Sequence, residues 1–169
     1  AAACAVEGLA TEADIDAVAK SFPGVEHRNE FERELDGVKY YNDSIASSPS
    51  RTIAGLHSFH QKVILIAGGY DKHIPFDVLG PEVCAHVKAL VLCGATAAKI
   101  RAAVESAPGY KAGTPDILEA HTLSEAVHLA KSAAHPGDIV TLSPACAAFD
   151  QFKNFAVRGN TYKQLVNAL

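Results

Sequence analysis

The chain has 169 residues, of which 49% are hydrophobic and 20% are charged, and its formal net charge is −4. This length and composition predict one packed globular domain with little chain left over. The acidic balance provides no basic surface for nucleic acid or an anionic membrane, and no apolar run approaches the roughly 20 residues of a membrane span.

The first residues, 1–5, have no basic segment and no long apolar segment, so we expect no secretion signal. The sequence has no methionine and opens as if within a helix, which predicts a piece of a longer chain. The cysteines are Cys4, Cys84, Cys93 and Cys146, and none forms a C-x-x-C pair. We therefore expect reduced, mostly buried thiols and a cytoplasmic location.

The pattern over residues 1–22 predicts helix, with a break at Gly8 and a new start at Thr11. Thr11 and Asp14 have the spacing of a capping box, and Pro23 ends the helical segment. The break at Pro23 predicts a domain boundary. Three apolar side chains are expected on one helical face: Ile15, Val18 and Phe22.

An Asp36-Gly37 pair between alternating runs, 29–35 and 38–42, predicts a β-hairpin. After it, short apolar runs alternate with helical patterns. Expected strands are 62–67, 89–93, 138–142 and a weaker one near 117–120; expected helices are 49–60, 76–87, 96–106, 124–134 and 155–168. This order predicts an α/β fold, a mostly parallel sheet with helices on both faces and one N-terminal β-hairpin.

In such sheets, ligands bind beyond the carboxyl ends of the strands. The segments expected at that edge are rich in glycine and small polar residues. They are 42–44, 68–72, 94–96 and 143–146. This composition predicts a binding crevice along one edge of the sheet.

Lys72 follows two glycines, so it is expected either to hold an anionic group or to be a solvated lysine on a turn. Asp43 could accept from a ribose hydroxyl, orient an arginine or cap the next helix. Ser44, Ser47 and Ser48 precede that predicted helix, where hydroxyls and N–H groups suit an anion as well as plain capping. Both interpretations stay open at each position.

Other chemistries have weaker support. Cys146 follows a strand, but no histidine or aspartate is tied to it by local sequence, which favours apolar packing over a nucleophile. His57 and His60 form the only helix-spaced histidine pair, which we expect to be surface decoration, so no metal site is predicted. The chain has neither G-x-G-x-x-G nor G-x-x-x-x-G-K-[ST]. The residues alone thus predict an α/β domain with an anion-binding crevice.

Four stretches occur in one order over residues 24–169. They are Gly24–Arg28, Tyr41–Ser47, Ile66–Lys72 and Leu142–Phe155 with Arg158-Gly159. In order and rough spacing they resemble the Mur ligase family. The last stretch is the most specific one, and it resembles the branch of the family that adds D-glutamate.

The resemblance implies a Rossmann-like domain from a three-domain, ATP-dependent ligase of peptidoglycan precursor synthesis. Residues 1–23 would be the helical tail of the central ATPase domain, and 24–169 the C-terminal amino-acid-binding domain. Such ligases use ATP and Mg²⁺ to form an acyl phosphate on UDP-N-acetylmuramoyl-L-alanine, which the D-glutamate amine then attacks. The P-loop and metal sites would lie in the central domain, which this domain contacts, and no catalytic residue is expected here.

The matching motif positions imply roles for individual residues. By this resemblance, Arg28 and Asp43 would bind the nucleotide, ATP or ADP. The expected D-glutamate contacts are Ser47, Lys72 and backbone N–H groups around Ala148, Phe149 and Phe155. Supporting residues would be His27, Asn42 and Ser44. Two positions depart from the family pattern, since Ile45 is often lysine and Ala148 is often serine.

Two alternatives remain. One is a Mur-type ligase for another amino acid, such as a glutamate-adding folate relative, against which residues 143–155 argue. The other is a non-catalytic α/β domain that binds a small anion or a partner, which the missing P-loop would also fit.

Overall fold

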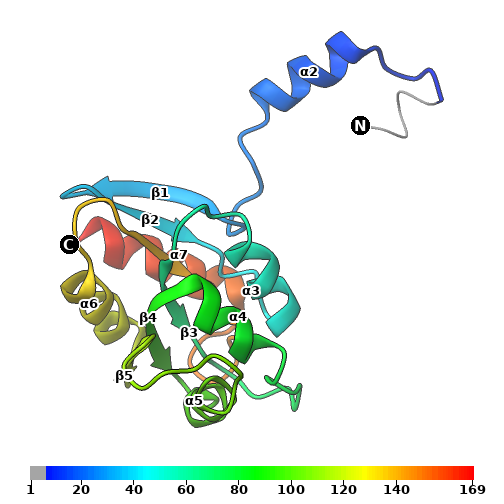
Figure 1. Cartoon of the computed structure of the whole chain (residues 1–169). Helices are drawn as coiled ribbons and strands as arrows, with labels where there is room; N and C mark the ends of the chain where they lie inside the picture. Colours follow the sequence, from blue (N-terminus) through cyan, green and yellow to red (C-terminus); the bar gives the residue numbers. More distant parts are fainter. Residues whose placement is uncertain (1–6) are drawn as a thin grey trace.

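The computed structural model describes residues 7–169 and shows an α/β fold around a six-stranded sheet (Figure 1). The strand order is β1-β2-β6-β3-β4-β5. The strands are β1 Glu30–Leu35, β2 Val38–Asn42, β3 Val63–Ala67, β4 Val87–Cys93, β5 Asp116–Ala120 and β6 Ile139–Leu142. The helices are α2 Glu12–Ser21, α3 Pro49–Leu56, α4 Leu79–His86, α5 Ala97–Glu105, α6 Leu123–Ala133 and α7 Phe155–Asn167.

The predicted hairpin is confirmed. β1 and β2 pair antiparallel, and the turn residues Asp36 and Gly37 both have positive φ, at 53° and 77°. β2 then pairs parallel with β6, and all the other strand pairs are parallel. The hairpin thus adds one antiparallel strand to the edge of an otherwise parallel sheet, which confirms the expected fold class.

Helices cover both faces of the sheet, as predicted. Because side chains alternate along a strand, β3 contributes Ile64 and Ile66 to one core and Val63, Leu65 and Ala67 to the other. The first core is closed by α6 and α7, and the second by α3, α4 and α5. Strands buried on both faces explain the continuous apolar runs in the sequence.

Several boundaries differ from the predictions. Helix α3 ends at Leu56 rather than 60, and the Ser58 hydroxyl donates to the Gly55 carbonyl just beyond that end. Helix α4 starts at Leu79 rather than 76. Val87, expected at the end of that helix, instead opens β4, where it pairs with Val63. Buried pairing in the sheet thus takes precedence over a continuous helical pattern.

The capping box before α2 is confirmed, because Thr11 and Asp14 exchange side-chain and backbone hydrogen bonds. The helix is shorter than predicted, and residues 7–10 form turns and bends; the part expected over residues 1–6 lies outside the described residues. No residue of α2 is buried, and Val18 and Phe22 are 64% and 58% exposed. Figure 1 shows α2 standing away from the sheet and its helices.

Within residues 7–169, no helix has both the length and the apolar character needed to cross a membrane.

Candidate functional site

The strands β2, β6, β3 and β4 run parallel, so their carboxyl ends lie together at one end of the sheet. This end is called the carboxyl edge below. The sequence segments singled out above follow these four strands. The fold therefore brings them to a common edge, as expected for a doubly covered sheet.

A cavity of about 350 Å³ opens at the end of β2. It brings together Arg28 and Asp43, the two residues expected on the nucleotide side. A third charged residue, Arg51 in the first turn of α3, also lines it. The full lining is Arg28, Asn29, Asp43, Ile45, Ala46, Arg51, Ala54 and Gly55.

The Asp43 carboxylate does not cap α3. One oxygen accepts from the Asn29 backbone N–H at 3.2 Å, and the other accepts from the Ser143 hydroxyl at 2.7 Å. The side chain of Ser48, the residue before α3, caps no N–H group either. The capping interpretation is therefore wrong for Asp43 and Ser48, and the Asp43 carboxylate is fixed as part of the pocket.

Burial raises the pKa of the Asp43 carboxyl, while the Ser143 hydroxyl, the Asn29 N–H and the charges of Arg28 and Arg51 oppose that rise. Gly55 of α3 also lines the pocket, and its lack of a side chain leaves room for the Asp43 carboxylate. A Cβ at that position would lie 2.9 Å from the second Asp43 oxygen. The pocket is thus lined by one buried carboxylate, that of Asp43, and by two exposed arginines, Arg28 and Arg51.

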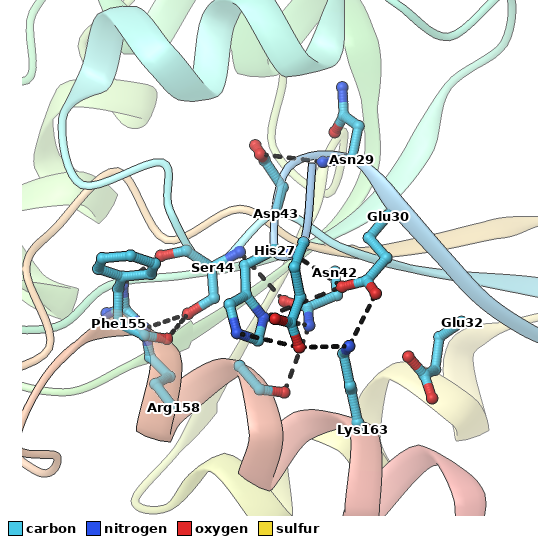
Figure 2. A network of polar contacts seen from close by, with 12 residues as sticks. His27, Asn29, Glu30, Glu32, Asn42, Asp43, Ser44, Phe155, Arg158 and Lys163 are labelled. Carbon is cyan, nitrogen blue, oxygen red and sulfur yellow. Dashed lines mark hydrogen bonds and ion pairs between the residues drawn. The ribbon is translucent and has the colours of Figure 1, made fainter. Parts of the chain in front are cut away.

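Behind the pocket, His27 and Asn42 form a buried pair (Figure 2). The Asn42 amide donates to Nδ1 of His27 at 3.0 Å and to the Gly159 carbonyl at 3.3 Å, which places the ring proton on Nε2. A Cβ at Gly159 would lie 2.4 Å from Nδ1 of His27. Glycine is therefore needed for α7 to approach the ring.

Arg158 of α7 is 3% exposed and joins two of the edge loops. Its guanidinium donates to the hydroxyl and carbonyl of Ser44 at 3.0 and 2.9 Å, and to the carbonyls of Cys146 and Ala147 at 3.0 and 3.1 Å. Burial lowers the pKa of Arg158 to about 10, so the group stays charged at neutral pH. Figure 2 shows Arg158 beside Ser44 and Phe155, whose carbonyl accepts from the Ser44 hydroxyl at 2.8 Å.

The Ala147 carbonyl also joins a third loop, the one after β3, to the other two. It accepts a hydrogen bond from the Tyr70 backbone N–H at 2.9 Å. A Cβ at Gly69 would lie 2.5 Å from the same carbonyl oxygen. The loop after β3 can therefore come this close only because position 69 is glycine. The loops after β2, β3 and β6 are thereby held in one arrangement.

Cys146 lies behind this junction and is 2% exposed. Its sulfur is 3.1 Å from the Thr96 hydroxyl, and burial raises its pKa to about 11. The thiol is therefore protonated at neutral pH. This agrees with the expectation of apolar packing and argues against a nucleophile.

The residues expected to contact D-glutamate lie on these joined loops. Lys72 is exposed and makes no hydrogen bond or ion pair with any residue from 7 to 169, whereas its neighbour Asp71 pairs with Lys99. Ser47 is half-buried, and Phe149 is 63% exposed with its ring 5.9 Å from that of Tyr70. Lys72 thus presents an uncompensated positive charge at this edge.

The Ala148–Phe155 segment supplies backbone donors. The N–H groups of Ala148 and Phe149, and those of Phe155 and Ala156 in the first turn of α7, donate to no acceptor among the described residues. Ala148 is 2% exposed as a whole residue, and its methyl side chain has no hydrogen-bonding group, so its backbone N–H is the donor it could offer. Unpaired N–H groups of this kind suit a carboxylate.

Several residues that build the site were not assigned a role from the sequence. Arg51 and Thr52 come from α3, Ser143 follows β6, and Asp150 accepts from the Ala95 N–H at 3.2 Å. Arg158 was noted only as part of a motif. Their position after strands or at the start of helices was visible, but the side-chain contacts span up to 114 positions.

The family model of the Mur ligase, glutamate ligase domain, matches residues 27–146. A UDP-N-acetylmuramoylalanine--D-glutamate ligase of Clostridium novyi (strain NT) is 55% identical over 169 residues, which is 100% of this chain and 37% of that protein. The chain therefore spans little more than a third of the length of the curated relatives it matches.

Two solved structures show the same fold. A murein peptide ligase from Psychrobacter arcticus 273-4 has a TM-score of 0.57 at 11% identity, over 90% of this chain and 32% of that one. A Mycobacterium tuberculosis folylpolyglutamate synthase complexed with ADP has a TM-score of 0.57 at 15% identity, over 84% and 32% respectively.

Proposed function

Because the chain belongs to the Mur ligase family, matching its glutamate ligase domain over residues 27–146, we propose that it is the amino-acid-binding part of an ATP-dependent ligase. The ligase would add D-glutamate to UDP-N-acetylmuramoyl-L-alanine in the cytoplasm. One observation supports this most: the Arg28–Asp43–Arg51 pocket and the loop after β3 that carries Lys72 lie at the same end of the sheet, where the parallel strands finish.

On the nucleotide side, Arg28 and Arg51 offer guanidinium groups for phosphate oxygens, and Asp43 offers a carboxylate to a ribose hydroxyl or to an arginine. Arg51 supplies a cation beside Ile45, where the family often has lysine. ATP supplies the phosphoryl group that activates the acceptor carboxylate. Asp43 is the only carboxylate in the pocket and is engaged by two donors, so the pocket does not itself fit Mg²⁺.

On the amino-acid side, D-glutamate has two carboxylates to hold and one amine to leave free. The Lys72 ammonium, the Ser47 hydroxyl and the N–H groups near Phe149 and Phe155 are all donors to anions and include no competing nucleophile. His27, Asn42 and Ser44 support them from behind, through Gly159 and Arg158. The contribution of these groups is to position the amine for attack.

We further propose that residues 1–23 are the helical tail of a preceding central domain and 24–169 the ligase domain proper. The apolar face of α2 is consistent with this, since none of Ile15, Val18 and Phe22 is buried within residues 7–169. In that arrangement the domain closes over ATP held by the central domain.

Phosphate release by the full-length protein tests the proposal. The assay contains ATP, magnesium and UDP-N-acetylmuramoyl-L-alanine, with D-glutamate, L-glutamate or no amino acid. Release that requires D-glutamate is the expected result. Release with L-glutamate instead would favour a Mur-type ligase for another amino acid, and folded protein without either response would contradict the proposal.

Replacing Arg51 by glutamine is expected to raise the KM for ATP by about 5- to 30-fold, with little change in the KM for D-glutamate. The reason is the loss of one charge-assisted contact to phosphate, worth about 1–2 kcal/mol at a partly exposed site. Steady-state kinetics of the full-length enzyme measure both constants.

Arg101→Gln is the matched control, because Arg101 is also an arginine near a helix surface but pairs with Glu105 and Glu119 away from the pocket. Equal effects of the two substitutions on the KM for ATP would show that Arg51 has no special part in nucleotide binding.

A further inference from the structure

Three potential metal ligands meet on the outer surface where α3 packs against α4. His57 is the residue that follows α3, and Glu82 and His86 lie one turn apart on α4. Nε2 of His57 is 2.6 Å from a Glu82 carboxylate oxygen, and Nε2 of His86 is 3.5 Å from the same oxygen. All three ligand atoms lie within 4.8 Å of one another.

The Glu82 carboxylate pairs with no lysine or arginine of residues 7–169, and both of its partners are imidazoles. The sequence pairs His57 with His60, but the fold pairs it with His86, whose ring centroid is 4.9 Å away. This contact joins positions 29 residues apart, so spacing in the sequence did not reveal it.

We propose that His57, Glu82 and His86 bind a divalent first-row transition-metal ion such as Zn²⁺. Two imidazoles and one carboxylate are a ligand set that zinc accepts with a water in the fourth position. Tetrahedral ligands about 2.0–2.1 Å from zinc are separated by roughly 3.3 Å. The 3.5 Å pair already fits, and the 2.6 Å hydrogen-bonded pair needs to open by less than 1 Å. The two imidazole nitrogens lie within 4.8 Å of each other and need to approach by at most about 1.5 Å.

The surroundings permit both the opening and the fourth ligand. The side chains of His57, Glu82 and His86 are 51%, 31% and 36% exposed, so water reaches the site. The imidazoles also select against the Mg²⁺ that a ligase reaction uses, since Mg²⁺ prefers oxygen ligands in octahedral geometry. The site is therefore separate from the proposed chemistry at the sheet edge.

A metal here clamps the end of α3 to α4. The same short helix lines the Asp43 pocket through Ala54 and Gly55, three and two positions before His57. A bound ion thus fixes one wall of that pocket from outside and stabilises the folded state by mass action, since the unfolded chain has no such preformed cluster.

Isothermal titration of the 169-residue chain with ZnCl₂, and separately with MgCl₂, tests the proposal. One zinc ion per chain and no magnesium binding are expected. His57→Ala and His86→Ala should each raise the Kd for zinc by at least about 100-fold, because even outer-shell partners of metal ligands are worth about 10- to 100-fold. His60→Ala is the matched control, an exposed histidine three positions from His57, and should leave the Kd unchanged.

A thermal melt with and without zinc provides the second measurement, and Glu82→Gln provides a variant that keeps the size of the side chain. Zinc should raise the Tm of the wild-type chain and of His60→Ala, but not of Glu82→Gln. Unchanged zinc affinity in the His57 and His86 variants, or an equal loss in His60→Ala, would overturn the proposal and leave His57 and Glu82 as a simple surface hydrogen bond.

Discussion

Replacing Lys72 by alanine in the full-length enzyme is expected to lower kcat/KM for D-glutamate by about 30- to 700-fold while the KM for ATP stays nearly constant. Removing one partner of a substrate ion pair inside a closed site costs about 2–4 kcal/mol. Lys72 fits that role because no carboxylate among residues 7–169 neutralises it, and Asp71 is held by Lys99. Titrating D-glutamate at saturating ATP measures the effect.

Lys39→Ala is the matched control for Lys72. Lys39 is also exposed and forms no hydrogen bond through its ammonium within the described chain, but it lies near the start of β2, opposite the carboxyl edge. Neither substitution should change the free energy of unfolding by more than about 0.5 kcal/mol, as is usual at the surface. If Lys72→Ala kept D-glutamate kinetics within twofold of the wild type, or if Lys39→Ala lost as much, Lys72 would not be a substrate ligand.

The sheet could be predicted because its strands carry strong local signals. The run at residues 63–67 is apolar throughout since both of its faces are buried, and Asp36-Gly37 adopts the positive φ values that a tight hairpin turn requires. Helix ends were predicted less well. Val87 suits either a helix or a strand by its local sequence, and its pairing with Val63 across the sheet decides the outcome.

The meeting of these segments at one end of the sheet also followed from local rules, because parallel strands place the segments after them at the same end. Arg28 and Asp43 line one pocket there, and their role in binding a nucleotide stays a prediction. What local sequence could not give is the set of contacts between distant segments. Arg158 contacts Ser44, and His57 contacts His86. Local sequence did not predict these contacts because both depend on how the helices pack in the folded chain.

Replacing Arg158 by methionine is expected to lower the free energy of unfolding by about 2–4 kcal/mol, although the side-chain volume is largely kept. The carbonyls of Ser44 and Cys146 accept from Arg158 in the native structure and would be left buried without a donor, at about 1–3 kcal/mol each. The Ala147 carbonyl would keep the Tyr70 N–H, and part of the loss is offset because a buried charge disappears. Urea unfolding monitored by circular dichroism measures the change.

Arg101→Met separates this explanation from simple ion pairing. Arg101 has two carboxylate partners, Glu105 and Glu119, whereas Arg158 has no carboxylate partner among the described residues. Counting ion pairs would therefore predict the larger loss at Arg101. Surface pairs contribute only about 0–1 kcal/mol, because water solvates the separated charges nearly as well. Buried carbonyls have no such substitute, so Arg158→Met should destabilise the fold more than Arg101→Met; the reverse order would show that the loops after β2 and β6 stay joined without the guanidinium.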